Sequence, residues 1–176
     1  EIFFKSLHLY KFESPIILIS SKKIVISQMK KLNFKKKIKL LNINNLSDLT
    51  LNNNSINLID INENQKIYVS KKKNKILEIS FNIAFNLLKS KFTNKFINGP
   101  INKHDFLKKK YLGMTEFISK KFKIKKTAML IYNKDISVCP LTTHLPLKLV
   151  HKKISKKLIE EKVILINDFY NKVLGF

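Results

Sequence analysis

Glycine and proline are rare in this sequence, and most of them fall in one stretch. Of the 3 glycines and 4 prolines in 176 residues, two glycines and three prolines lie between Ile97 and Leu147. Both residue types fix backbone conformations that other residues adopt with difficulty. We expect the turns of this stretch to be closely specified. Polar side chains beside them are the first candidates for a functional site, because loops held between rigid elements commonly carry sites.

Composition limits the class of protein. The chain is 44% apolar, yet no uninterrupted apolar run approaches the ~20 residues of a membrane span. Cys139 is the single cysteine, which excludes an intrachain disulfide and suits a reducing cytoplasm. The sequence starts without methionine and stops directly after a helical pattern. We therefore expect residues 1–176 to be one partial domain of a longer cytoplasmic protein, with no membrane partner.

The net charge of +23 invites comparison with nucleic-acid-binding proteins. All 35 basic residues are lysine and none is arginine, whereas phosphate and base recognition favour the bidentate guanidinium. The lysines are also spread along the chain. We interpret them mainly as solvated surface and expect no nucleic-acid partner, with a basic nucleic-acid-binding module as a remote alternative.

Helical and strand-like segments alternate along the chain, which predicts an α/β fold. An apolar run at 16–19 is typical of a buried parallel strand. The segments 128–131 and 136–139 flank a turn and predict an antiparallel hairpin within a mixed sheet. Ser21 and Ser155 are candidate helix caps, and Gly175 is a candidate helix stop. Helices are predicted at 2–12, 22–32, 75–89, 102–111, 115–122, 147–153 and 155–174. Further strands are predicted at 38–41, 56–59 and 95–98, and a loop at 42–54.

His144 is the strongest single candidate for chemistry. It follows a predicted strand and two threonines and precedes Leu-Pro, a position that presents an imidazole at the end of a strand. Imidazole is a common ligand of transition metals, and Thr142 or Thr143 could orient it. A structural or merely exposed histidine is the competing interpretation. No other histidine or cysteine lies at metal-ligand spacing from it.

Two further turns could bind an anion. Gly113, Met114 and Thr115 enter a predicted helix, where free N–H groups and a hydroxyl favour negative charge; taken alone, the motif is more often a simple helix cap. The segment 98–103 could form a wall of a site, with Gly99, Asn102 and a charged Lys103. Its alternative is a turn with a solvated lysine.

Three motifs occur in order: GPINK at 99–103, GMTEF at 113–117 and TTHLPL at 142–147. Together they resemble the 4-hydroxythreonine-4-phosphate dehydrogenase family, and their order and spacing match it. The resemblance implies an α/β/α sandwich with a mixed sheet, like that of isocitrate dehydrogenases and incomplete here. It corresponds to the middle portion of the family, without its glycine-rich opening or its downstream half.

The resemblance also implies a chemistry. Members oxidise a phosphorylated hydroxy-amino acid with NAD, and the product loses CO₂ to give an amino-ketone phosphate for vitamin B6 synthesis. A divalent metal (Zn, Mg or Co) is held by three histidines. His144 resembles the first, and the others would lie beyond Phe176, the third on the partner subunit of a homodimer. No NAD-binding residue is expected within this chain.

Met114 departs from the family pattern. Thr115 resembles a substrate-contacting residue, but the family usually has histidine where this chain has Met114, and methionine cannot donate a hydrogen bond. Other phosphorylated hydroxy acids, such as a phosphorylated threonate or erythronate, are therefore alternative substrates. We expect residues 1–176 alone to be inactive, since one histidine cannot complete the metal site.

Overall fold

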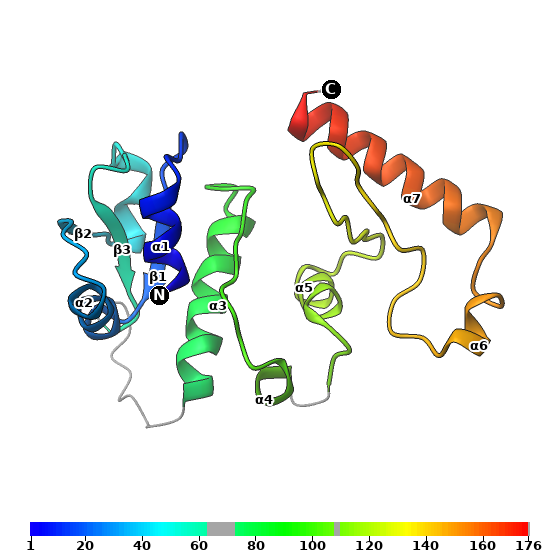
Figure 1. Cartoon of the computed structure of the whole chain (residues 1–176), viewed down its shortest axis with the longest axis horizontal. Coiled ribbons are helices and arrows are strands. Elements are labelled where there is room, and N and C mark those ends of the chain that lie inside the picture. Colours follow the sequence, from blue (N-terminus) through cyan, green and yellow to red (C-terminus); the bar gives the residue numbers. More distant parts are fainter. Residues whose placement is uncertain (63–72, 108–109, 176) are drawn as a thin grey trace. The chain divides into compact units, whose positions relative to one another are not determined.

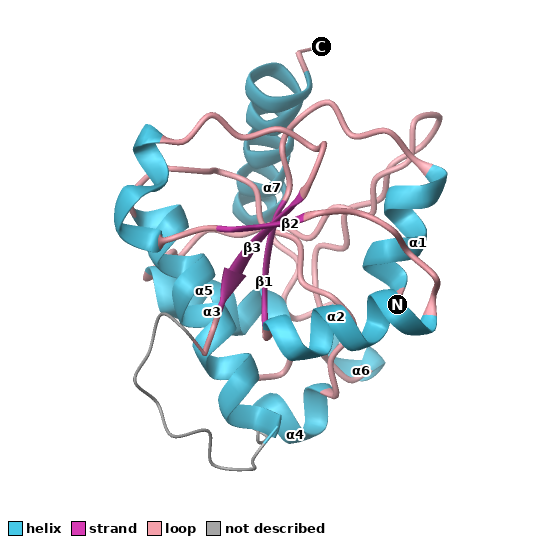
Figure 2. Ribbon diagram, turned by 90° about the vertical axis from the view of Figure 1, so that its left-hand side faces the viewer, coloured by secondary structure: helices cyan, strands magenta, loops and turns pink. Residues whose placement is uncertain are grey.

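The computed structural model describes residues 1–62, 73–107 and 110–175 (Figure 1). The chain divides into two compact units, Glu1–Ile101 and Asn102–Phe176. The first unit contains a sheet of three parallel strands in the order β1-β3-β2. The three strands lie together in Figure 2. The strands are β1 (Ile17–Ser20), β2 (Ile38–Leu40) and β3 (Ile56–Asp60). All three were predicted from the sequence, and each boundary agrees within one residue.

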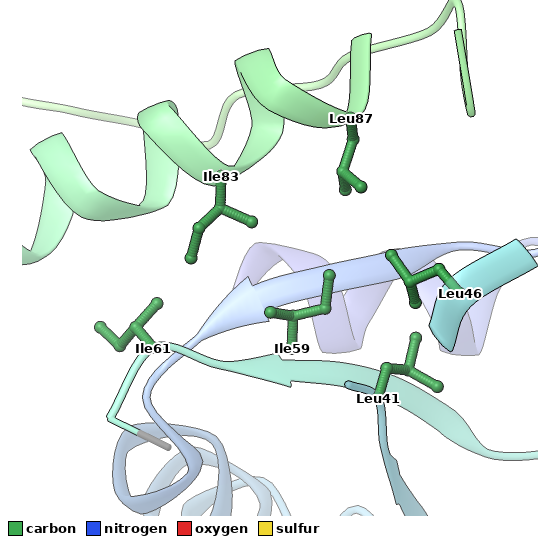
Figure 3. Close-up of a cluster of buried hydrophobic side chains, with 6 residues drawn as sticks. All are labelled: Leu41, Leu46, Ile59, Ile61, Ile83 and Leu87. Carbon is green, nitrogen blue, oxygen red and sulfur yellow. The ribbon is translucent and has the colours of Figure 1, made fainter. Parts of the chain in front are cut away.

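Helices cover both faces of this sheet. On one face, Ile56 and Leu58 of β3 belong to a buried cluster with Phe4 and Val25. On the other face, Ile59 and its neighbours form a second cluster (Figure 3). The first face is covered by α1 (Ile2–Leu9) and α2 (Lys22–Lys31), and the second by η1 (Ile43–Asp48) and α3 (Lys73–Lys89). The α/β/α sandwich expected from the sequence is confirmed.

The second unit is built from helices and long connections. Its last helix has the predicted boundaries: the Ser155 hydroxyl accepts the N–H of Leu158 at 3.2 Å, and Gly175 ends the helix in the left-handed region at φ 77°. None of the described helices has the length and apolar character needed to cross a membrane. The elements are α4 (Lys103–Leu107), α5 (Met114–Phe122), α6 (Leu147–Val150), α7 (Lys156–Phe169) and the π-helical turn η2 (Tyr170–Leu174).

Three strand predictions are wrong. The expected hairpin of 128–131 and 136–139 is one antiparallel bridge, in which Ile131 and Val138 exchange N–H···O bonds of 2.8 and 3.0 Å. Side chains on both segments are exposed, and an isolated two-stranded ribbon is marginal in water. Segment 95–98 is not a strand, because Phe96 instead packs its ring against α3. The described sheet is consequently parallel, without the antiparallel strands that a mixed sheet requires.

Several predicted boundaries also need correction. The helices expected at 2–12, 102–111 and 147–153 end earlier; residues 108–109 lie outside the described part of the chain. The loop expected at 42–54 contains η1, whose start the Asn42 side chain caps. Ser21 precedes α2 as expected, but its hydroxyl accepts from the Asn62 amide. The Asp60 carboxylate accepts the N–H of Lys22 instead, at 3.3 Å.

Ile59→Ala tests the importance of the central strand. Ile59 is 0% exposed, so its truncation should lower the free energy of unfolding by about 2–5 kcal/mol. Ile24→Ala, on α2 and 48% exposed, is the matched control and should cost much less. Urea denaturation of both variants measures the difference, and equal losses would show that β3 is not the core.

Candidate functional site

The first turn of α5 supplies one side of the candidate site. Gly113 is the residue before this helix and is buried, while Thr115 and Glu116 lie half-buried in the first turn. A carboxylate in the first turn interacts favourably with the positive end of the helix dipole. The motif that predicted a turn entering a helix therefore does form one, and it places two polar side chains together.

The loop between the Ile131–Val138 bridge and α6 supplies the other side. Its His144 has φ 57°, in the left-handed region that residues other than glycine rarely adopt. The side chain is exposed, and it lies beside the start of α5. An uncommon backbone conformation at a polar residue is a reason to suspect function.

Glu116 and His144 converge over Gly113. A Cβ placed on Gly113 would lie 2.8 Å from Glu116 Oε2 and 3.0 Å from His144 Nε2, closer than the packed structure allows. The hydroxyl of Thr143 also donates a long hydrogen bond of 3.5 Å to Glu116 Oε1. The absence of a Cβ at Gly113 therefore lets the carboxylate and the imidazole approach the same place.

These groups line a small hollow in the second unit. The space open to water-sized molecules is about 60 Å³, enough for several waters. Lys162 reaches the hollow from α7, and its ammonium donates to the carbonyl of Thr127. The lining residues are Thr115, Glu116, Thr127, Met129, Pro140, Leu141, Thr143, His144 and Lys162.

The residues expected to form the site are therefore only partly together. His144, Thr115 and Thr143 share the hollow, whereas Met114 does not line it. Asn102 caps α4: its side-chain carbonyl accepts the N–H of Asp105 at 3.3 Å, and its amide donates to the Asp105 carboxylate at 2.8 Å.

Two other expected wall residues are also outside the hollow. Lys103 is exposed and does not line the hollow. Gly99, in the first unit, has nothing within 4 Å of the position that a Cβ would occupy, so no close approach requires glycine there.

Sequence reasoning gave no role to six residues that line the hollow, and two of them, Glu116 and Lys162, are charged. Glu116 belongs to the GMTEF motif, but the sequence alone assigned it no part in the site. Its position three residues after Gly113 is the signal that could have identified it. Lys162 is one of 35 lysines and carries no local signal. Its place in the hollow depends on how α7 lies in the second unit.

The donor set suits part of a cation site. An imidazole and a carboxylate lie within about 3 Å of the space that Gly113 keeps free, and Glu116 Oε2 is buried with no hydrogen-bond partner among the described residues. Nitrogen and carboxylate oxygen are both ligands of divalent metals. Within the described ranges, no group of three such side chains is found, so further ligands would have to come from elsewhere.

Gly113→Ala should displace the two converging side chains. Because the atoms it would strike are the ends of Glu116 and His144, the chain should stay folded while the His144 ring moves. Gly99→Ala is the control, since its added methyl meets nothing within 4 Å. The His144 ring signals in NMR spectra should shift in the first variant alone; unchanged signals in both would contradict the close approach.

Comparisons with known proteins agree with the fold and with the motifs. A family model described as pyridoxal phosphate biosynthetic protein PdxA matches residues 11–176. The 4-hydroxythreonine-4-phosphate dehydrogenase of Aquifex aeolicus is 45% identical over 71 residues, which are 38% of this chain and 22% of that protein. The enzyme of the same name from Hydrogenobaculum sp. is 36% identical over 90 residues, 49% of this chain and 29% of that protein.

A solved structure extends the likeness to the fold. The crystal structure of 4-hydroxythreonine-4-phosphate dehydrogenase from Klebsiella pneumoniae superposes with a TM-score of 0.68 at 18% identity. The superposition covers 93% of this chain and 51% of that one, so the chain spans about half the length of this neighbour. With a family model that matches nearly the whole sequence, the chain belongs to the PdxA family of pyridoxal phosphate biosynthetic proteins.

Proposed function

We propose that this chain is part of an NAD- and divalent-metal-dependent dehydrogenase that oxidises 4-phosphooxy-L-threonine in vitamin B6 synthesis. Membership of the PdxA family and the names of the matched relatives support this activity. The observation that carries the proposal is the hollow in which His144 lies with Thr115, Thr143 and Glu116. The substrate is a small phosphorylated hydroxy acid, and the working protein is a homodimer.

NAD, when bound, would accept a hydride from the hydroxyl-bearing carbon of the substrate, and the hydroxyl proton would be released. The resulting β-keto acid loses CO₂ and leaves an amino-ketone phosphate. A bound Zn²⁺, Mg²⁺ or Co²⁺ supplies Lewis acidity that lowers the pKa of the substrate hydroxyl and polarises the forming carbonyl. Within this chain His144 would hold the cation, and two further histidines, one from the partner subunit, would complete its ligands.

Thr115 contributes to substrate binding. Thr115 lies in the first turn of α5 and lines the hollow. Its hydroxyl and the N-terminus of the helix both favour an anionic group of the substrate there. Met114 precedes it and offers only a weak thioether acceptor. This substitution keeps a phosphorylated threonate or erythronate as the alternative substrate.

Removal of the His144 imidazole tests the metal site. In titrations with Co²⁺ followed by visible absorption, His144→Ala should weaken cation binding by at least about tenfold. His151→Ala is the matched control, because His151 is exposed at the end of α6 and does not line the hollow. Equal affinities of the wild type and His144→Ala would rule out His144 as a ligand. We expect residues 1–176 alone to form no NADH, since they supply one of the three histidines.

Met114→His tests the substrate. In the natural protein that contains these residues, a restored donor should raise kcat/KM for 4-phosphooxy-L-threonine relative to phosphorylated threonate by about tenfold, the effect of one hydrogen bond to a charged group. Leu112→His places the same imidazole at a position that is 71% exposed and should leave the ratio unchanged. An unaltered ratio in Met114→His would remove position 114 from substrate selection. NADH formation at saturating metal provides the measurement.

A further inference from the structure

One lysine of the second unit is partly withdrawn from solvent. Of the lysines that the structure describes in this unit, Lys162 alone is half-buried, and all the others are exposed. The chain contains 35 lysines, and an exposed side chain is the ordinary state of this residue type, so the exception needs a cause. Lys162 lies on α7 and lines the hollow that contains His144.

The ammonium of Lys162 is fixed in place but not neutralised. It donates a hydrogen bond to the carbonyl of Thr127, which occupies one of its three N–H groups. None of the ion pairs in the described part of the chain includes Lys162. Glu116 lines the same hollow without pairing with it, and the adjacent Glu161 pairs with Lys126 at 3.8 Å. Two N–H groups and the positive charge of Lys162 therefore remain available.

Two hydroxyl groups of the hollow are also available. Thr115, in the first turn of α5, and Thr127 are both half-buried and line the hollow. Neither hydroxyl forms a hydrogen bond with the described residues, whereas the hydroxyl of Thr143 donates to Glu116 Oε1. The ammonium of Lys162 and the hydroxyls of Thr115 and Thr127 thus form a set of donors around one small space.

The hollow has room for one end group of a substrate. About 60 Å³ is open to water-sized molecules, and one water needs roughly 10–15 Å³ of such space. A phosphate or a carboxylate group fits this space, whereas a whole phosphorylated amino acid does not. Lysine binds phosphate as a point charge, and threonine hydroxyls can donate further hydrogen bonds to its oxygens.

Glu116 carries the opposite charge in this hollow. Its Oε1 accepts from the Thr143 hydroxyl, on the loop that continues into His144. The ammonium of Lys162 is tied instead to the carbonyl of Thr127. Because the two charges form no ion pair, the hollow offers a cation-binding side at His144 and an anion-binding side at Lys162.

We propose that Lys162 is a substrate-binding residue: its ammonium, with the hydroxyls of Thr115 and Thr127, binds an oxyanion of the substrate, either its phosphate or its carboxylate. The inference deepens the proposed function and rests on it for the identity of the substrate. A phosphorylated hydroxy acid carries a hydroxyl for the cation and oxyanions for Lys162. The role of Lys162 is therefore the same for 4-phosphooxy-L-threonine and for a phosphorylated threonate or erythronate.

Inorganic phosphate and acetate test the anion site without turnover. In the natural protein that contains these residues, Lys162→Met should weaken binding of phosphate, acetate or both by about tenfold, the effect of losing a hydrogen bond between charged groups. Isothermal titration calorimetry at constant ionic strength provides the measurement, and the ligand whose affinity falls identifies the group. Methionine keeps the aliphatic stem of lysine, and Lys162→Arg, which keeps the charge, should retain most of the affinity.

Lys157→Met is the matched control, because Lys157 is exposed on the same helix and does not line the hollow. It should bind both anions as the wild type does. A wild type that binds neither anion, an unchanged affinity in Lys162→Met, or equal losses in the two methionine variants would overturn the proposal.

Steady-state kinetics give the second readout. Lys162→Met should raise the KM for 4-phosphooxy-L-threonine by about tenfold with little change in kcat, because a contact made equally in the ground state and the transition state affects binding alone. An unchanged KM would contradict a role in substrate binding. If the wild type forms no NADH from any of these substrates, the proposed function fails, and the phosphate and acetate titrations still decide whether Lys162 binds an anion.

Discussion

Burial of the central strand β3 is the constraint on which the first unit depends. All five of its residues are buried, and its alternating side chains join one helical layer to each face of the sheet. The Asn57 side chain adds two buried hydrogen bonds: its amide donates to the carbonyls of Ile16 and Asn52 at 3.1 and 2.8 Å. These bonds tie the approaches of β1 and β3 together. A strand buried on both faces cannot slip by one residue without placing polar groups in the core.

The parts of the fold that the sequence predicted are those with a complete local signal. The run at 16–19 has apolar side chains on both faces, which a parallel strand between two helical layers requires. The last helix has Ser155 at its start and Gly175 at its end, and both act as predicted. Segments 95–98 and 136–139 have comparable β-propensity, but a strand also needs a neighbour. Phe96 finds α3 instead, and Ile136 remains 73% exposed.

The candidate site was predicted in its residue types but not in its geometry. His144 and Thr115 belong to motifs whose order carried the resemblance, and both line the hollow. The convergence of Glu116 with His144 could not be predicted, because it depends on the left-handed backbone of His144 and on the missing Cβ of Gly113. The left-handed backbone has no local sequence signal, and Gly113, although visible in the sequence, does not show which side chains approach it. Sequence reasoning identified Gly113 as a turn residue, whereas its structural role is to permit close approach.

Glu116 is connected with two unusual features of the second unit, the left-handed backbone of His144 and a buried oxygen that has no hydrogen bond. A histidine with a left-handed backbone and a buried oxygen without a hydrogen bond each lower the stability of the fold. A single explanation for both features is simpler than two separate ones. Both features occur beside Gly113: Glu116 Oε1 accepts from the Thr143 hydroxyl, and Glu116 Oε2 and His144 Nε2 both lie close to the position that a Gly113 Cβ would occupy. A chain whose composition has shifted so far toward lysine still has a half-buried carboxylate here without a lysine partner. The loop that carries Thr143 and His144 is therefore held against the first turn of α5, and the missing Cβ of Gly113 leaves the room that the Glu116 and His144 side chains approach.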